Sequence, residues 1–204
     1  MTLLAASGCR SSGAPAAQKP VGYVPDSVRA EVASLISQLK SESEVVSYAD
    51  EKAESIAIDR LCEIGLPAVG QLVASYYEST SDPQLRHFRY FVLDTLKRMQ
   101  QPASLPFIMQ VAQYGDRREK RVAVEAIWAF GDSMCVETLI NALEDEDTEV
   151  VNTAAAGLRA ITGVSFGLYP NTTPRQREEA IRKWQHWWSV TGGSYQARQT
   201  GSQR

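Results

Sequence analysis

The sequence predicts an all-α protein, a short α-solenoid of about four helical hairpins that follow one N-terminal helix. Apolar stripes with helical spacing recur at offsets of 35, 31 and 31 residues. Aspartate precedes most of these stripes, and glycine follows most of them. Each hairpin would expose apolar faces on both sides, so stacking against its neighbours is the economical way to bury them.

Length and charge are those of one ordinary globular domain, with 204 residues and a formal net charge of -3. This balance gives no general attraction to nucleic acid or to anionic lipid. No apolar run reaches about 18 residues, the length that a membrane-spanning helix needs. We place a truncated signal and flexible linker at 1–25, the repeat domain at 26–190 and a disordered tail at 191–204.

The N-terminal segment contains a cysteine in unusual surroundings. "LLAASGCR", residues 3–10, leads through small residues to Cys9, and "SSGAPAAQKPVGYVP" follows as a flexible linker. This stretch resembles the lipobox of bacterial lipoproteins, which implies cleavage before Cys9 and lipid attachment to its thiol. The alternative is a disordered tail with an incidental cysteine.

Two departures from the lipobox pattern concern this segment. Ala6 stands where the family usually has leucine, and only eight residues precede Cys9. A basic region and a full apolar region do not fit into that length. We therefore expect the true start of the protein to lie upstream of Met1.

A first helix is predicted over 26–40, and the repeats follow it. Each repeat begins with an apolar stripe at i, i+4 and i+7, one face of a helix. The four stripes are Ala57, Leu61 and Ile64; Val92, Leu96 and Met99; Ala123, Ile127 and Phe130; and Ala154, Leu158 and Ile161. Shorter apolar segments from 67, 104 and 135 supply the second helices of three hairpins.

Helix boundaries agree with this repeat. Asp82 before Pro83, Asp116 three residues before Glu119, and Asp147 are helix-starting signals. The predicted C-terminal glycines are Gly65, Gly131 and Gly163.

These segments resemble the short bacterial HEAT-like repeats that also occur in phycobilisome lyases. The resemblance rests on "AIDRLCEIGLPAVGQLV" from Ala57 and "RVAVEAIWAFGDSMCVETLINALEDED" from Arg121. It covers roughly residues 44–190 and implies a stacked array of hairpins. It says little about chemistry.

The closing segment begins a well-marked helix, with Thr173 as N-cap, Pro174 first and Gln176 at the third position. Together with "ITGVSFG", it resembles the last unit of many bacterial HEAT-repeat proteins. Trp184 and Trp188 then lie on one helical stripe. They either seal the end of the array or form an aromatic ligand site, and we favour the seal.

Catalytic groups are scarce. His87 and His186 lie far apart in the sequence without a metal-ligand motif, and we interpret both as surface residues. The acidic run from Glu144 to Asp147 lacks the order of a calcium loop, which favours a solvated capping turn. Cys62 and Cys135 are predicted to be free thiols in helices. We therefore expect no enzyme activity, no cofactor and no metal.

Basic residues on consecutive repeats form the candidate interaction surface, which consists of Arg86, Arg89, Arg117, Arg118 and Arg121. Stacking would align them in a positive stripe able to meet an acidic partner or phosphates. Glu119 and Glu125 interrupt the stripe, and ordinary solvated helix faces are the alternative.

The functional expectation is a non-catalytic protein-interaction scaffold, held at a bacterial membrane surface through a lipid anchor on Cys9. Its partner would be another protein, with no nucleic acid expected, and its place the cell envelope outside the cytoplasm. Without processing of Cys9 the protein would be cytoplasmic. The alternatives are a phycobilin-lyase-like enzyme and a solenoid that binds phosphate or nucleic acid.

Overall fold

The computed structural model describes residues 24–45 and 55–201, and within them the protein is all-α. Nine α-helices are present in this part of the chain. They are α1 (Asp26–Val45), α2 (Ile56–Ile64), α3 (Leu66–Ser79), α4 (Arg86–Met99), α5 (Leu105–Tyr114), α6 (Arg117–Phe130), α7 (Val136–Ala142), α8 (Thr148–Thr162) and α9 (Pro174–Gly201). Short 3-10 turns precede α4, α5 and α7. Cys9 and the rest of 1–23 lie outside the described residues.

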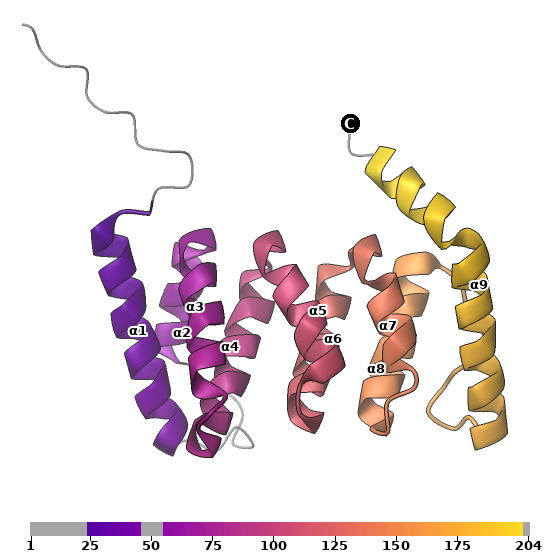
Figure 1. The fold of residues 1–204 in the computed structure, drawn as a ribbon, viewed down its shortest axis with the longest axis horizontal. Helices are drawn as coiled ribbons and strands as arrows, with labels where there is room; N and C mark the ends of the chain where they lie inside the picture. Colours follow the sequence, from indigo (N-terminus) through magenta and orange to yellow (C-terminus); the bar gives the residue numbers. More distant parts are fainter. Residues whose placement is uncertain (1–23, 46–54, 202–204) are drawn as a thin grey trace, which may run out of the picture.

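The helices lie side by side in chain order along the long axis of the molecule (Figure 1). Helices α2, α4, α6 and α8 contact one another in succession, and we call them the first layer. Helices α3, α5 and α7 form the second layer, in which α5 packs against α7. Packing between the two layers mainly joins α3 to α4, α5 to α6 and α7 to α8. It therefore links successive predicted hairpins rather than the two helices within one.

Helix starts follow the predicted capping residues. Asp116 accepts hydrogen bonds from the backbone N–H groups of Arg118 and Glu119, and the Glu119 carboxylate accepts from the Asp116 N–H at 2.7 Å. Asp147 caps α8 by accepting from the Glu149 N–H at 3.0 Å. Both predicted caps are confirmed, because these side chains satisfy donors that have no partner within the helix.

Predicted glycines end two of the first-layer helices, and a glutamine stands at the equivalent position of a third. Gly131 and Gly163 end α6 and α8 with φ values of 63° and 71°, in the left-handed region that glycine adopts without strain. The equivalent position after α4 is Gln100, which has φ 46° and takes the same role without being glycine.

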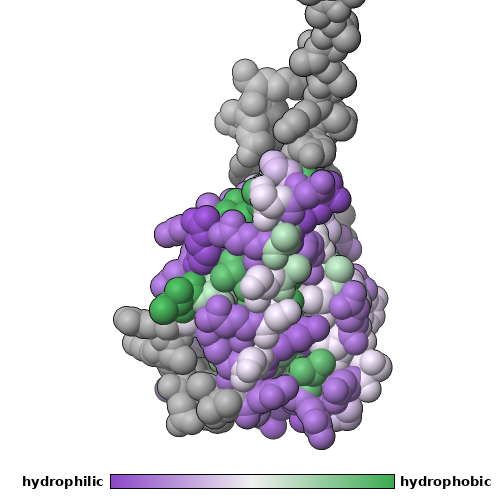
Figure 2. All heavy atoms as spheres, turned by 90° about the vertical axis from the view of Figure 1, so that its left-hand side faces the viewer, coloured by the Kyte–Doolittle hydropathy of each residue, from purple (hydrophilic) through white to green (hydrophobic). Residues whose placement is uncertain are grey.

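Two different helices close the ends of the stack. Helix α1 packs its apolar side, including Val32 and Leu39, against α2, α3 and α4. The outer surface at this end is mostly hydrophilic, with apolar residues in separate small patches (Figure 2). At the other end Trp184 of α9 is 1% exposed and contacts Phe166 edge to face, with ring centroids 4.9 Å apart. This burial supports the sealing role of the tryptophan stripe.

The terminal helices are longer than predicted. Helix α1 continues to Val45 instead of ending at 40, and α9 continues to Gly201, past the expected boundary at 190. The sequence expectation of a disordered tail from 191 thus differs from the structure, where 191–201 are helical. Helical hydrogen bonding propagates readily once a helix is nucleated, so the glycines at 192 and 193 weaken α9 without ending it.

Candidate interaction surface

The predicted basic stripe lies along the first layer, where acidic residues of the next helix meet it. Arg89 is buried, and its Nε donates to the Glu119 carboxylate at 2.6 Å while its Nη1 donates to the Ser79 carbonyl at 3.0 Å. Arg86 remains exposed and lies 3.6 Å from the Asp116 carboxylate. Of the two, Arg89 therefore joins helices instead of facing a partner.

The next helix repeats this arrangement around Asp147. Arg117 donates a hydrogen bond to the Asp147 carboxylate at 3.0 Å. Arg121 donates to both oxygens of the same carboxylate, from Nε to Oδ2 and from Nη2 to Oδ1, the latter at 2.9 Å. The hydrogen bond from Arg121, together with that from Arg117, holds the pKa of the Asp147 carboxyl far below its usual range although burial opposes this. We call the pairs Arg86–Asp116, Arg89–Glu119, Arg117–Asp147 and Arg121–Asp147 the ion-pair ladder.

Arg118 completes the predicted set. Its guanidinium lies over the Tyr90 ring, 5.2 Å from the ring centroid. The Tyr90 hydroxyl donates to Asp116 at 3.2 Å, and burial, with the Asp116 charge, raises the pKa of this tyrosine to about 12. The structure thus brings the five predicted arginines together along α4 and α6, where carboxylates pair with Arg86, Arg89, Arg117 and Arg121.

The second layer has the opposite composition. Helices α3 and α7 each contain one charged residue, Glu78 and Glu137, and α5 contains none. No lysine or arginine occurs in these three helices. Two tyrosines and three amides are among the exposed residues of these helices, and we call this set the tyrosine surface: Tyr77, Gln110, Gln113, Tyr114 and Asn141.

A hollow of about 280 Å³ lies between α3 and α5 on this surface. The Tyr77 hydroxyl donates to the Gln110 side-chain oxygen at 2.8 Å, which ties the two helices together across it. Tyr76 and Phe107 pack edge to face beneath, with centroids 5.0 Å apart. Tyr114 stands at the rim with 80% of its surface exposed. A hollow with a rigid aromatic wall and few charges suits an apolar side chain.

A second hollow of about 340 Å³ lies between α5 and α7, and Tyr114 borders both hollows. Its far wall carries Asn141, Glu144 and Asp145. Lys120 donates to Asp145 at 2.8 Å, and this contact keeps the pKa of the Asp145 carboxyl below its usual range against the effect of burial. Tyr114 is therefore a ridge with an aromatic hollow on one side and a polar, partly acidic hollow on the other.

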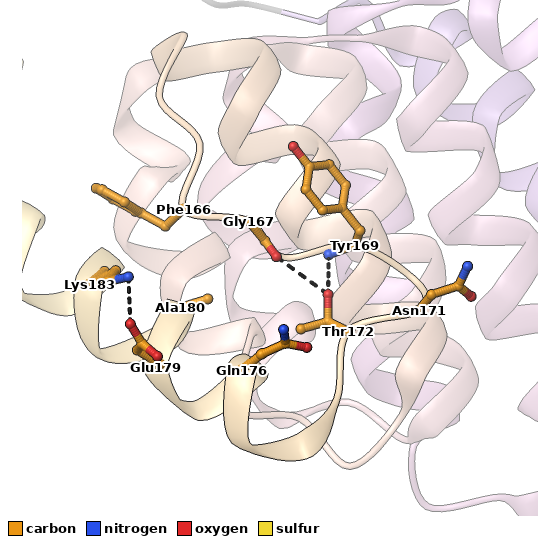
Figure 3. A pocket seen from close by; sticks show the side chains of 9 residues that line it. All are labelled: Phe166, Gly167, Tyr169, Asn171, Thr172, Gln176, Glu179, Ala180 and Lys183. Carbon is orange, nitrogen blue, oxygen red and sulfur yellow. Dashed lines mark hydrogen bonds and ion pairs between the residues drawn. The ribbon is translucent and has the colours of Figure 1, made fainter.

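A third hollow of about 460 Å³ lies beside the first turns of α9 (Figure 3). Its polar groups mostly bond to one another. Glu179 pairs with Lys183 at 2.7 Å, and the Thr172 hydroxyl accepts from the Tyr169 N–H at 2.8 Å. The Thr172 contact lies within the loop before α9, and the Glu179–Lys183 pair lies on the first turns of α9 itself, so this hollow belongs to the closing unit.

Groups suited to catalysis do not converge in the described part of the chain. His186 is exposed, and His87 lies 6.1 Å from the Tyr90 ring, measured between ring centroids. Burial raises the pKa of the Cys135 thiol to about 12, so the thiol stays protonated and unreactive at neutral pH. Among the residues described, no group of three metal-ligating side chains occurs, and no helix is long and apolar enough to cross a membrane.

No known protein family and no curated protein matches this sequence. Reasoning from the sequence selected the basic stripe and overlooked the tyrosine surface. A signal for the latter was present, since the segments 66–77 and 105–114 contain no charged residue at all. Exposed positions on a helix are usually charged, and their neutrality marks a surface of another kind.

Proposed function

We propose that this protein is a non-catalytic protein-interaction module, a short HEAT-like α-solenoid whose recognition face is the tyrosine surface of α3, α5 and α7. One observation carries the proposal. Tyr114 is 80% exposed and Tyr77 is 46% exposed on a layer without a single basic residue. Tyrosine is enriched and charge is depleted at the centre of protein interfaces.

The solenoid architecture supports the same proposal. Successive helices form two layers, one joined by the ion-pair ladder and one presenting neutral side chains. Stacked helices of this kind offer an extended surface whose side chains select a partner without a reaction centre. The ladder also disfavours phosphate or nucleic-acid binding, because carboxylates already hold most of the arginines that phosphates would need.

The proposal includes a location. A lipid on Cys9 would hold the module at a bacterial membrane surface in the cell envelope, and the linker up to Pro25 would let it stand off. Cys9 lies outside the described residues, so the sequence pattern alone supports this part. Intact-mass measurement of the protein from its native membranes tests it: an added acyl mass on Cys9 is expected, and an unmodified soluble chain would contradict it.

Site-specific photocrosslinking in native cells tests the recognition face. A benzophenone amino acid placed at 77 or 114 should yield discrete protein adducts that mass spectrometry identifies. The matched control is position 128, because Trp128 on α6 is also 46% exposed but belongs to the first layer. Adducts from 128 together with none from 77 and 114 would overturn the proposal.

A further inference from the structure

We propose that the tyrosine surface binds an extended polypeptide segment that carries an apolar side chain and, about three residues away, a lysine or arginine. The inference rests on the proposed function and deepens it by naming the chemistry of the partner. Its basis is the pair of hollows on either side of Tyr114, which differ in what they can accept.

The hollow between α3 and α5 accepts the apolar side chain. Its walls are Tyr76, Tyr77, Val111 and the Tyr114 ring, and Arg89 and Glu119 lie there as an ion pair already satisfied at 2.6 Å. Because this pair is closed and its side chains are almost fully buried, it offers no free charge to a ligand. An aliphatic or aromatic group therefore gains contact there, whereas a charged one would lose hydration without a partner.

The hollow between α5 and α7 accepts the basic side chain. Glu137 and Asn141 lie one turn apart on α7 and are both exposed, and the exposed Glu144 follows in the turn after the helix, next to Asp145 and Glu146. Lys120 bonds to Asp145, and Arg177 donates to the carbonyls of Leu143 and Asp145.

These two cations balance only part of the acidic charge. Glu144 accepts a hydrogen bond from the neutral Gln185 side chain at 2.6 Å, and this contact adds no positive charge to the site. An ammonium or guanidinium group is the complement of this edge, and a carboxylate would be repelled.

The spacing follows from helix geometry. Neighbouring packed helices lie about 10 Å apart, and an extended chain advances about 3.3 Å per residue, so about three residues connect the two hollows. A segment crossing α5 in this way lies over Tyr114. The tyrosine ring then supplies contact area at low conformational cost, and the glutamine amides beside it are available to the backbone of the segment.

Labelled ten-residue peptides provide the test. One set contains a single phenylalanine followed at two, three or four residues by a single lysine in a Gly/Ser background. A second set has glutamate in place of the lysine, and a third has serine in place of the phenylalanine. Fluorescence anisotropy with the full chain should show binding for the first set, and at least tenfold weaker binding for the other two.

Variants assign the binding to the surface. Tyr114→Ala should weaken the first set at least tenfold, and Glu144→Lys should reverse the preference between lysine and glutamate peptides. Glu125→Lys on the exposed face of α6 is the matched control and should change neither. Circular dichroism verifies that all variants are folded.

The outcomes separate this inference from the proposed function. Equal binding of lysine and glutamate peptides, or no binding of any set, overturns the inference. If photocrosslinks from 77 and 114 persist in that case, the interaction module stands and its partner presents a different chemistry. If those crosslinks are also missing, both proposals fail.

Discussion

The two layers of the stack contrast in what their side chains do. In the first layer, charged residues of α4 and α6 reach the next helix and form the ion-pair ladder, with Arg89 and Glu119 almost fully buried. In the second layer, α5 has no charged residue, and its Tyr114 is 80% exposed. The charged residues of the first layer hold neighbouring helices together, and the neutral residues of the second layer leave Tyr77 and Tyr114 exposed to solvent.

This difference shows that the count of charges on a helix does not reveal its role. Basic residues on successive helices suggest a surface for acidic ligands, yet here they bind carboxylates of the same chain. A solvated neutral face carries more information, because nothing inside the protein requires tyrosine at an exposed position.

The largest expected effect comes from removing one partner of the buried pair. Arg89→Ala leaves the Glu119 carboxylate buried without its cation and should lower the free energy of unfolding by about 3–5 kcal/mol. Urea unfolding at pH 7 measures it. Arg98→Ala is the control, since that side chain is 44% exposed beside Asp94 and should cost less than about 0.5 kcal/mol. Equal costs for the two variants would show that the ladder does not hold the layer together.

A smaller loss of stability is expected when Asp147 is replaced, and this loss should depend on pH. Asp147→Asn keeps an oxygen for the Glu149 N–H but loses the charge that Arg117 and Arg121 bind, so stability at pH 7 should fall by about 2 kcal/mol.

The depressed pKa of Asp147 fixes the direction of the pH dependence. Its contribution is complete above about pH 4, the ordinary value for aspartate in an unfolded chain, and declines as the pH falls toward the lower folded-state pKa. The stability difference between wild type and Asp147→Asn should therefore shrink as the pH falls from about 4 to about 2. A difference that grows in acid would contradict this assignment.

The smallest effect on stability is expected on the tyrosine surface. Tyr114→Ala should change the free energy of unfolding by less than about 0.5 kcal/mol, because the ring is 80% exposed. Tyr76→Ala is the contrasting variant in the same hollow, since its ring is 5% exposed and its loss should cost about 3 kcal/mol. Thermal melts of both variants check this. A large loss in Tyr114→Ala would mean that the ring supports the fold instead of a partner.

Much of the local structure was predictable from particular residues. Asp116 with Glu119 and Asp147 mark helix starts, and Gly131 and Gly163 mark helix ends, because capping depends only on neighbours within a few residues. The end of α9 was not predictable in this way. Glycines at 192 and 193 indicate a stop, and the helix nevertheless continues to Gly201.

The candidate site was harder to predict than the helices. Whether an arginine is paired depends on a carboxylate about one repeat away. The partners in Arg86–Asp116, Arg89–Glu119 and Arg117–Asp147 are each 30 positions apart. That offset is close to the repeat length, so the register of the repeats already implied the pairing. Whether a given pair is buried or exposed required the packing of α4 against α6.

The sequence by itself determined that the chain is helical, where most helices begin and end, and that they repeat, because these properties follow from short-range hydrogen bonding and apolar periodicity. Only the tertiary structure decided which charged side chains pair with one another between helices and which side chains remain exposed to solvent. Burial and ion pairing are set by residues distant in sequence, and stacking alone brings Arg89 to Glu119 while leaving Tyr114 exposed.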